Sequence, residues 1–379
     1  QQWQGWYSCV GCHVQGAAVA VASKGIQRQL QVPKASVDQV LQLMRDRTLA
    51  EPRGAISRGG GDEGTDPVAW SGFGLALYQK HAAGVTVGGG TYSDQGALLD
   101  DYAYYLALRQ DASGRVPNTH GPLGYPSYSH IEPPVLVSAD DGALQITAYA
   151  ALLWQQAGSA YAENLSRAGV YLQSTDISGS PLTQDHASLI LGLTAAGNDL
   201  TSDGKLSNAV TALIARQHED GGWGESDEMT SNAYATGQAV YALRKAGGAA
   251  PDGLNVAAGG AGVRWLLDHQ ITTGDNRGAW PQGSTQSGRG GGALFTYTMW
   301  PVLALEEIEL RTVAIDIKPG SLPNTINVDS NGRVPVAVLT DANFDAAKVD
   351  PQSVTLGQAK AVRWSMEDAD NDGDTDLVL

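Results

Sequence analysis

The hydrophobic and polar positions of this chain follow two different periods. From about residue 16 to residue 310, apolar residues gather in short Ala- and Leu-rich runs separated by loops rich in Gly, Ser and Asp. Runs of this length predict helices. From Val313 onward, β-branched residues alternate with others, and this period predicts strands. We therefore expect a helical domain over residues 16–310 and a small β domain over residues 312–379.

The helical part repeats a pair of segments. The first member of each pair is apolar and ends at a glycine, the residue that most readily closes a helix in the left-handed conformation. The expected closing glycines are Gly84, Gly158, Gly197 and Gly247. The second member is more amphipathic and tends to end in a glutamine. The expected second helices span residues 96–109, 160–173, 205–217 and 258–270.

One of these glutamines opens a motif. Gln217 is followed by Gly221 and Trp223 in the spacing Gln-x-x-x-Gly-x-Trp, and a helical segment over residues 231–243 comes next. These residues resemble the QW repeats of the terpenoid cyclase and prenyltransferase superfamily. The resemblance is closer to bacterial secreted proteins with prenyltransferase/squalene-oxidase repeats, which carry a Cys-x-x-Cys-His segment near the N-terminus.

This resemblance covers roughly residues 5–310 and implies a mainly α fold. The implied architecture is an α/α toroid of helical hairpins, in which inner helices are ringed by outer ones. The glutamine amide then caps a helix end and the tryptophan ring stacks over it, so both residues are structural. Other copies are degenerate, since Gln110 reaches Val116 where Trp is expected and Gln270 reaches Trp280 only after an insertion.

The acidic motif of class II terpene cyclases is not intact. In that family the central Asp of Asp-x-Asp-Asp protonates an alkene, and the nearest match here, residues 138–141, lacks the first carboxylate. A neighbouring acid is needed to hold the proton on one carboxyl group. Asp140 and Asp141 are instead expected to cap a helix that begins near Gly142. Only three Phe residues are present, which argues against an aromatic cavity for carbocations. We do not expect terpene cyclase activity.

Both cysteines of the chain lie in the segment Cys9-Val-Gly-Cys12-His13. Two cysteines at this spacing, followed at once by histidine, predict covalent attachment of haem c. The two thiols add to the haem vinyl groups, and His13 is the proximal ligand. Two alternatives stay open. One is a Cys9–Cys12 disulfide, which stabilises little because its loop is small. The other is zinc, for which the sequence has no second ligand pair.

Two residues are candidates for the sixth haem ligand. The segment after the motif resembles the repeated inner helix and ends at Gly25, so counting back from the glycines places His13 at the level of His186. Inner helices of a toroid run parallel, so both histidines are expected at one mouth of the ring. Met299 is the alternative, and methionine raises the reduction potential. A structural role is open for each, beside a helix start for His186 and in the core for Met299. Further candidates in the loop over residues 111–137 are His120 and His130.

The β part resembles a module appended to many secreted bacterial and archaeal proteins. It contains the spacing Asp-x-Asp-x-Asp-Gly-x-x-Asp, the first nine positions of a calcium loop. The expected Ca²⁺ ligands are Asp368, Asp370, Asp372, the backbone carbonyl of Asp374, and Asp376. A solvated acidic turn is the other interpretation. We expect a β-sandwich-like module that is incomplete at Leu379. Three explanations stay open: the missing part is disordered, it has been cleaved, or another subunit completes the module through strand addition.

Charge and the chain's ends limit the classes of partner. The net charge of −16 is spread along the chain, which argues against nucleic acid and anionic membranes. No apolar run approaches the length of a membrane span. The sequence begins Gln-Gln-Trp without a leader, which we interpret as the N-terminus left after signal cleavage. We therefore expect a secreted, periplasmic or cell-surface protein.

These patterns favour an extracytoplasmic c-type haem protein on a toroid scaffold, acting in electron transfer or haem-based binding with a redox partner protein or neighbouring subunits. The first alternative is an enzyme or binder that acts on an isoprenoid or other apolar ligand in the toroid cavity. The second is a structural surface protein with a Cys9–Cys12 disulfide, which assembles through its β module.

Overall fold

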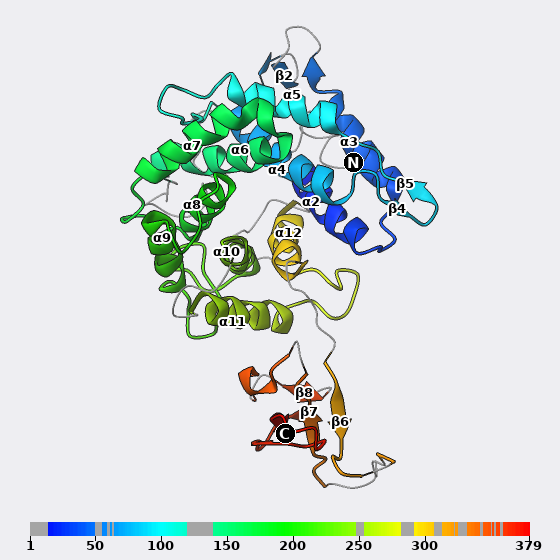
Figure 1. Cartoon of the computed structure of the whole chain (residues 1–379). Helices are drawn as coiled ribbons and strands as arrows, with labels where there is room; N and C mark the ends of the chain where they lie inside the picture. Colours follow the sequence, from blue (N-terminus) through cyan, green and yellow to red (C-terminus); the bar gives the residue numbers. More distant parts are fainter. Residues whose placement is uncertain are drawn as a thin grey trace. The chain divides into compact units, whose positions relative to one another are not determined.

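The chain divides into two compact units, Gln1–Ile308 and Glu309–Leu379, which we call the helical unit and the β unit (Figure 1). The computed structural model describes residues 14–49, 55–58, 61–62, 64–119, 139–247, 254–281, 292–306, 313–321, 323–324, 332–341, 344–349, 351, 354–356 and 359–379.

The helices of the helical unit alternate between an inner ring and an outer layer. The inner helices are α2 (Val14–Gln27), α4 (Thr65–His81), α6 (Ala143–Ala157), α8 (Thr183–Ala195), α10 (Ala233–Lys245) and α12 (Gly292–Glu306). Each packs on the next, and α12 packs on α2, so the ring is closed (Figure 1). The described outer helices are α3 (Lys34–Arg45), α5 (Gly96–Ala107), α7 (Ala162–Ser174), α9 (Gly204–Ile214) and α11 (Leu254–Asp268). This is an α/α toroid, as predicted.

Short elements fill the connections. They are β1 (Thr48–Leu49), β2 (Ala55–Arg58), β3 (Gly61–Asp62), β4 (Thr86–Val87), β5 (Gly90–Thr91) and the 3₁₀ turns η1 (Ala139–Gly142) and η2 (Ser159–Tyr161). Strands β1, β2 and β3 form one small sheet, and β4 pairs with β5 in a hairpin.

Burial explains which helices lie inside. Helix α4 is buried without a break from Thr65 to Tyr78, whereas outer helix α9 buries only one face, through residues such as Leu206 and Leu213. A helix that is apolar all round must be enclosed, and an amphipathic one covers it. The four predicted closing glycines have φ between 64° and 93°. The prediction for Gly25 is wrong, because α2 continues through it to Gln27.

Glycines let neighbouring inner helices touch through their backbones. A Cβ on Gly74 of α4 would lie 2.1 Å from the carbonyl oxygen of Gly16 in α2, and one on Gly237 of α10 would lie 2.5 Å from the nitrogen of Pro301 in α12. Gly16 lies against Trp70 near the start of α4, and Lys24 lies beside His81 at its end. Helices α2 and α4 therefore run parallel.

A three-part clamp joins outer and inner helices in repeated copies. The glutamine amide donates to a turn carbonyl: Gln110 to Gly114 at 2.9 Å, Gln217 to Gly221 at 2.7 Å and Gln270 to Gly278 at 3.0 Å. The backbone N–H that follows the turn then donates to a threonine on the next inner helix. These pairs are Val116 with Thr147, Trp223 with Thr236 and Trp280 with Thr298.

The tryptophans of this clamp cap the outer helices. The indole of Trp223 donates to the Leu213 carbonyl at the end of α9, and that of Trp280 donates to the Leu266 carbonyl in the last turn of α11. The predicted division of labour is therefore wrong in its detail: the indole reaches the helix end, and the glutamine amide holds the turn.

The β unit has a small core and an antiparallel sheet in the order β10-β11-β7-β6. These strands are β6 (Ile315–Ile317), β7 (Val336–Val338), β10 (Ser365–Glu367) and β11 (Asp376–Val378). A hairpin of β8 (Thr355–Leu356) and β9 (Ala359–Lys360) and the 3₁₀ turn η3 (Ala346–Lys348) complete its described elements. Leu377 pairs with Val338 in register, and both are buried with Ala346.

Helices of membrane-spanning length and hydrophobicity do not occur in the described part of the chain.

Candidate functional site

Five buried aromatic side chains from four inner helices meet inside the ring. We call them the inner aromatic cluster: Trp70 and Phe73 of α4, Tyr149 of α6, Tyr241 of α10 and Trp300 of α12. Phe73 stacks on Tyr149 at 5.4 Å and on Trp300 at 5.8 Å between ring centroids. Trp70 meets Tyr149 edge-on at 4.8 Å. The low Phe content had argued against an aromatic cavity; the structure shows a packed aromatic cluster, which Trp and Tyr mostly supply.

Polar side chains converge on this cluster around the hydroxyl of Tyr149. The amide nitrogen of Gln145, one turn earlier on α6, lies 3.2 Å from that hydroxyl. Ser188 of α8 and Gln238 of α10 also approach it, and Asp66 of α4 lies close enough to act on it electrostatically. Burial raises the pKa of Tyr149 far above its ordinary value, so the hydroxyl stays protonated.

Glu225, in the loop before α10, extends this polar layer. The hydroxyl of Tyr297 donates to its Oε1 at 2.6 Å, and Asn232 donates to the same oxygen at 3.2 Å. No hydrogen bond from the described residues reaches the other carboxylate oxygen, Oε2. The ring of Tyr234 on α10 lies 5.9 Å from that of Tyr297 between centroids, and the amide nitrogen of Gln238 lies 3.4 Å from the Tyr234 hydroxyl. Burial raises the pKa of Tyr234 as well.

Buried amide atoms on four inner helices have no hydrogen-bond partner. They are Oε1 of Gln15 on α2, Oε1 of Gln145 on α6, Nε2 of Gln184 on α8 and Oε1 of Gln238 on α10, whose side chains are at most 5% exposed. Gln184 lies one helical turn before Ser188, so both side chains belong to the same face of α8. A buried polar atom without a partner loses its hydration and gains nothing in return, at a cost of about 1–3 kcal/mol. Each such atom in a native structure calls for an explanation, such as a bound water, an ion or a functional role.

The buried charges at this end of the ring are negative. In the described part of the helical unit, the charged side chains that are buried are Lys24, Asp66, Asp185 and Glu225. Asp66 and Asp185 lie in the first turns of α4 and α8, where the helix dipole stabilises carboxylates. Lys24 lies in the last turn of α2, 3.3 Å from Nε2 of His81, and so at the opposite end. We call the end that holds the acids and the glutamines the acidic mouth.

The sequence did not predict this site, although its spacing holds a signal. Asp66, Trp70 and Phe73 recur at intervals of four and three along α4, and Tyr234, Gln238 and Tyr241 do the same along α10. Such spacing places each set on one helix face. The signal is hidden because neighbouring positions on inner helices are also buried.

The predicted haem residues are only partly described. Cys9, Cys12, His13, His120 and His130 lie outside the described residues. His186 is 2% exposed, and its Nε2 lies 3.3 Å from the Ser180 carbonyl, to which Arg216 also donates. Burial, together with the charge of Arg216, lowers the pKa of His186 to about 4. Its imidazole is therefore neutral near pH 7, with Nδ1 unpartnered. Met299 is 1% exposed on α12.

Asp140 and Asp141 do not cap α6. Both have positive φ, 51° and 55°, and α6 begins only after Gly142. The Asp140 carboxylate accepts two hydrogen bonds from Arg115, at 2.6 and 3.1 Å, and one from Tyr171 at 2.7 Å. This carboxylate is therefore held in an ion pair.

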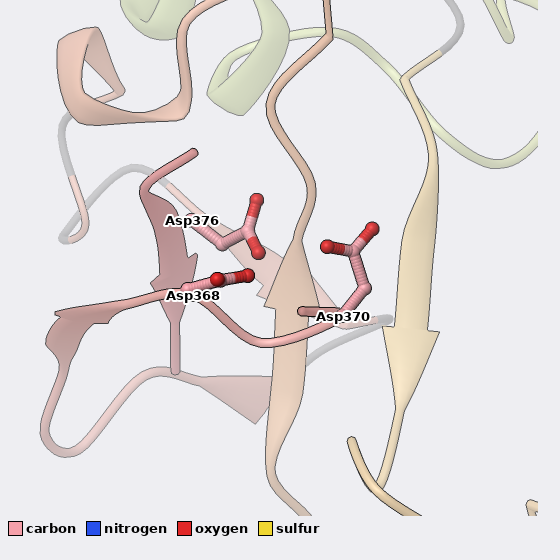
Figure 2. Close-up of side chains that lie close together, drawn as sticks. All are labelled: Asp368, Asp370 and Asp376. Carbon is pink, nitrogen blue, oxygen red and sulfur yellow. The ribbon is translucent and has the colours of Figure 1, made fainter. Parts of the chain in front are cut away.

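In the β unit, three of the predicted calcium ligands come together. One carboxylate oxygen from each of Asp368, Asp370 and Asp376 lies within 4.8 Å of the others (Figure 2). Asp376 is fully buried, and its two oxygens accept from the backbone N–H groups of Thr340 and Ala369 at 2.8 and 2.9 Å. The loop between Asp370 and Asp376 contains a tight turn, in which Gly373 has a φ of 97°.

The remaining acids of this loop lie beside the cluster. The Asp372 carboxylate accepts from the backbone N–H of Asp374 at 3.1 Å. Lost hydration and the neighbouring carboxylates, Asp372 first, raise the pKa of Asp374 to about 6. The pKa of Asp370 is raised for the same reasons. Hard oxygen donors crowded in this way suit Ca²⁺.

Comparison with known proteins leaves the activity open. No protein-family profile matches this sequence, and no curated protein matches it. Among solved structures, the chain is similar to the type II terpene cyclase MstE from Scytonema in its apo form, with 19% identity, a TM-score of 0.48, and coverage of 77% of this chain and 88% of that chain. A variant of MstE in complex with its product, merosterolic acid A, matches with the same identity and TM-score over 78% of this chain and 86% of that chain.

Proposed function

We propose that the helical unit binds an apolar, isoprenoid-like small molecule inside the ring at the acidic mouth. The inner aromatic cluster supports this proposal because Trp, Tyr and Phe faces supply a large apolar contact area. The observation that carries it is the set of buried amide atoms without partners on Gln15, Gln145, Gln184 and Gln238. A ligand with a polar end and an apolar body would fit this arrangement: the polar end would form hydrogen bonds with these amides, and the body would contact the aromatic rings.

The arrangement favours binding over proton-initiated cyclisation. An acid that protonates an alkene must be held in its protonated form. Asp140, the nearest counterpart of the cyclase acid, is held by Arg115 and Tyr171. Tyr149 and Tyr234 keep their protons because burial raises their pKa values, so both hydroxyls stay neutral and can form hydrogen bonds with a ligand.

The test is ligand extraction followed by titration. Protein from its native source is extracted with organic solvent and the extract is analysed by mass spectrometry; the stripped protein is then titrated with the isoprenoid alcohol farnesol by calorimetry. We expect an apolar compound in the extract and saturable binding of farnesol. An empty extract together with no heat of binding would overturn the proposal.

A pair of tyrosine variants locates the binding. Tyr149→Phe keeps the ring and removes the hydroxyl of the polar layer, so farnesol binding should weaken by roughly fivefold to tenfold, the worth of one hydrogen bond. Tyr161→Phe is the matched control, since that hydroxyl binds Asp100 near the outer helices. Equal affinity of both variants would place the ligand elsewhere.

We also propose that the N-terminal segment carries one haem c, bound through Cys9 and Cys12 with His13 as proximal ligand. The support is the attachment motif, whose His13 directly precedes inner helix α2. When bound, the haem supplies one-electron redox chemistry. An ultraviolet–visible spectrum of natively processed protein, oxidised and reduced, with pyridine haemochrome analysis, tests this. A c-type spectrum supports it, and its ligand-field bands separate His186 from Met299 as sixth ligand. A featureless visible region removes it.

For the β unit we propose one Ca²⁺, held by Asp368, Asp370 and Asp376, with Asp372 and the backbone carbonyl of Asp374 completing the loop. The support is the convergence of carboxylate oxygens and the raised pKa values of Asp370 and Asp374, which indicate repulsion that a cation would relieve. Asp370→Asn should abolish calorimetric Ca²⁺ binding, and Glu367→Gln, an exposed acid on adjacent β10, should leave it unchanged. Unaltered binding by Asp370→Asn would contradict the assignment.

A further inference from the structure

The charges of the acidic mouth restrict the chemistry of its ligand. We infer that the polar end of the ligand is a hydrogen-bond donor that is neutral or cationic, an alcohol or an amine, and that anionic ends such as carboxylate, phosphate or diphosphate are excluded. This inference rests on the proposed function and specifies its ligand class.

The first observation is the sign of the buried charges. Asp66, Asp185 and Glu225 are each at most 5% exposed, and all three lie at this end of the ring. The buried cation of the described helical unit, Lys24, lies at the opposite end beside His81. An anionic group that enters beside Glu225 would meet a buried carboxylate in a low-dielectric environment, and none of the described residues forms an ion pair with that carboxylate.

The second observation is the hydrogen-bonding capacity that is left over. Three of the four unpartnered amide atoms, on Gln15, Gln145 and Gln238, are carbonyl oxygens and therefore acceptors. Glu225 adds a stronger acceptor, because Tyr297 and Asn232 both donate to Oε1 and no described residue donates to Oε2. A layer that offers mainly acceptors selects a ligand that brings donors.

The third observation places the aromatic faces beside these acceptors. Tyr234 lies 5.9 Å from Tyr297 between ring centroids, and Glu225 acts electrostatically on Tyr234. A cationic nitrogen beside Glu225 would therefore also meet aromatic faces, and ring quadrupoles attract cations. The buried carboxylates, the unpartnered acceptors and the aromatic rings together favour an amine as the polar end of the ligand, and an alcohol after it.

A matched ligand series tests this. Full-length protein is titrated by calorimetry with farnesylamine, farnesol and farnesyl diphosphate, which share one hydrocarbon body. We expect the amine to bind more tightly than the alcohol, and the diphosphate to bind at least about tenfold more weakly than the alcohol. Equal or tighter binding of the diphosphate overturns the inference and leaves the proposed function standing. Failure of all three to bind overturns the proposed function itself.

Two glutamate variants assign the effect to one residue. Glu225→Gln keeps the size of the side chain and removes its charge, so amine binding should weaken by about tenfold while alcohol binding changes by less than about threefold. Glu228→Gln removes the same charge from an exposed position of the same loop and should change neither. If Glu225→Gln does not fold, the order of the three ligands on the wild-type protein still decides the question.

Discussion

At the scale of single residues, a substitution at Gln184 should change folding stability and ligand affinity in opposite directions. Its side chain is 2% exposed, and its Nε2 has no hydrogen-bond partner. Gln184→Met keeps the length of the side chain and removes the stranded polar atom. We expect the free energy of unfolding to rise by about 1 kcal/mol, whereas affinity for farnesol falls. Urea denaturation and calorimetric titration measure the two effects.

Gln95 provides the matched control for this prediction. It is 3% exposed, but its amide is satisfied by the Ser93 hydroxyl, and its oxygen accepts from Arg45 at 2.6 Å. Gln95→Met should therefore lower the free energy of unfolding by about 1–3 kcal/mol without affecting the ligand. If the Gln184 variant is destabilised as much as the Gln95 variant, Gln184 is an ordinary structural residue.

The acidic loop of the β unit should make stability depend on pH when no cation is bound. Lost hydration and repulsion raise the pKa of Asp370, and raise that of Asp374 to about 6. A carboxyl group with a raised pKa in the folded state binds its proton more tightly folded than unfolded. Its stabilising contribution is therefore present below its ordinary pKa of about 4 and is lost as the pH rises through about 6.

Thermal unfolding in EDTA across this range measures the effect. The melting temperature of the β unit should fall as the pH rises from about 4 to about 6. Saturating Ca²⁺ should remove the fall, because metal binding requires the deprotonated carboxylates. A melting temperature in EDTA that rises over the same interval contradicts the prediction.

At the scale of elements, the threonines of the repeated clamp are its least obvious members. The Thr236 hydroxyl accepts from the backbone N–H of Trp223 at 3.0 Å, and both residues are fully buried. Thr236→Val preserves shape but leaves that N–H without a partner, so the free energy of unfolding should fall by about 1–3 kcal/mol. Thr236→Ser keeps the hydroxyl and should recover much of this loss. Urea denaturation of both variants distinguishes the hydrogen bond from packing.

The same clamp shows which features the sequence alone predicts. Closing glycines and the Gln-x-x-x-Gly-x-Trp turn were found because they act within a few residues of the chain. Thr147 and Thr236 were missed because each meets its partner only after the chain has turned into the next inner helix. Gly25 was wrongly expected to close a helix because a glycine can also serve close packing, as Gly25 does against Val32.

The candidate site was beyond sequence analysis for a related reason. A buried inner helix gives no amphipathic signal, so nothing marked Trp70, Tyr149 and Trp300 as neighbours. Closure of the ring brings them together, and closure depends on packing between helices far apart in sequence. The aspartates of the acidic loop were predictable because their spacing is local, and the structure brings three of them together.

At the scale of the whole molecule, the two units differ greatly in the size of their cores. The helical unit has one extensive apolar core, whereas the buried hydrophobic residues described in the β unit are Ala337, Val338, Ala346 and Leu377. Burial in a small core supplies little more free energy than the loss of conformational entropy on folding costs. The repulsion in the acidic loop reduces this margin further, so a bound cation should matter far more to the β unit than to the helical unit.

Limited proteolysis of the full-length chain tests this difference. In EDTA near pH 7, we expect early cleavages to fall within the β unit, at bonds in or near β10 and β11, while the helical unit survives. With Ca²⁺ the same bonds should be protected, because the ion ties the start of the loop at Asp368 to Asp376, the first residue of β11. Mass spectrometry of the early fragments gives the order of cleavage. Asp370→Asn should be cut equally fast with and without Ca²⁺, whereas Glu367→Gln should behave as wild type. If the helical unit is cleaved first, or if the β unit resists cleavage equally well in EDTA and in Ca²⁺, the small core of the β unit is sufficient without the ion.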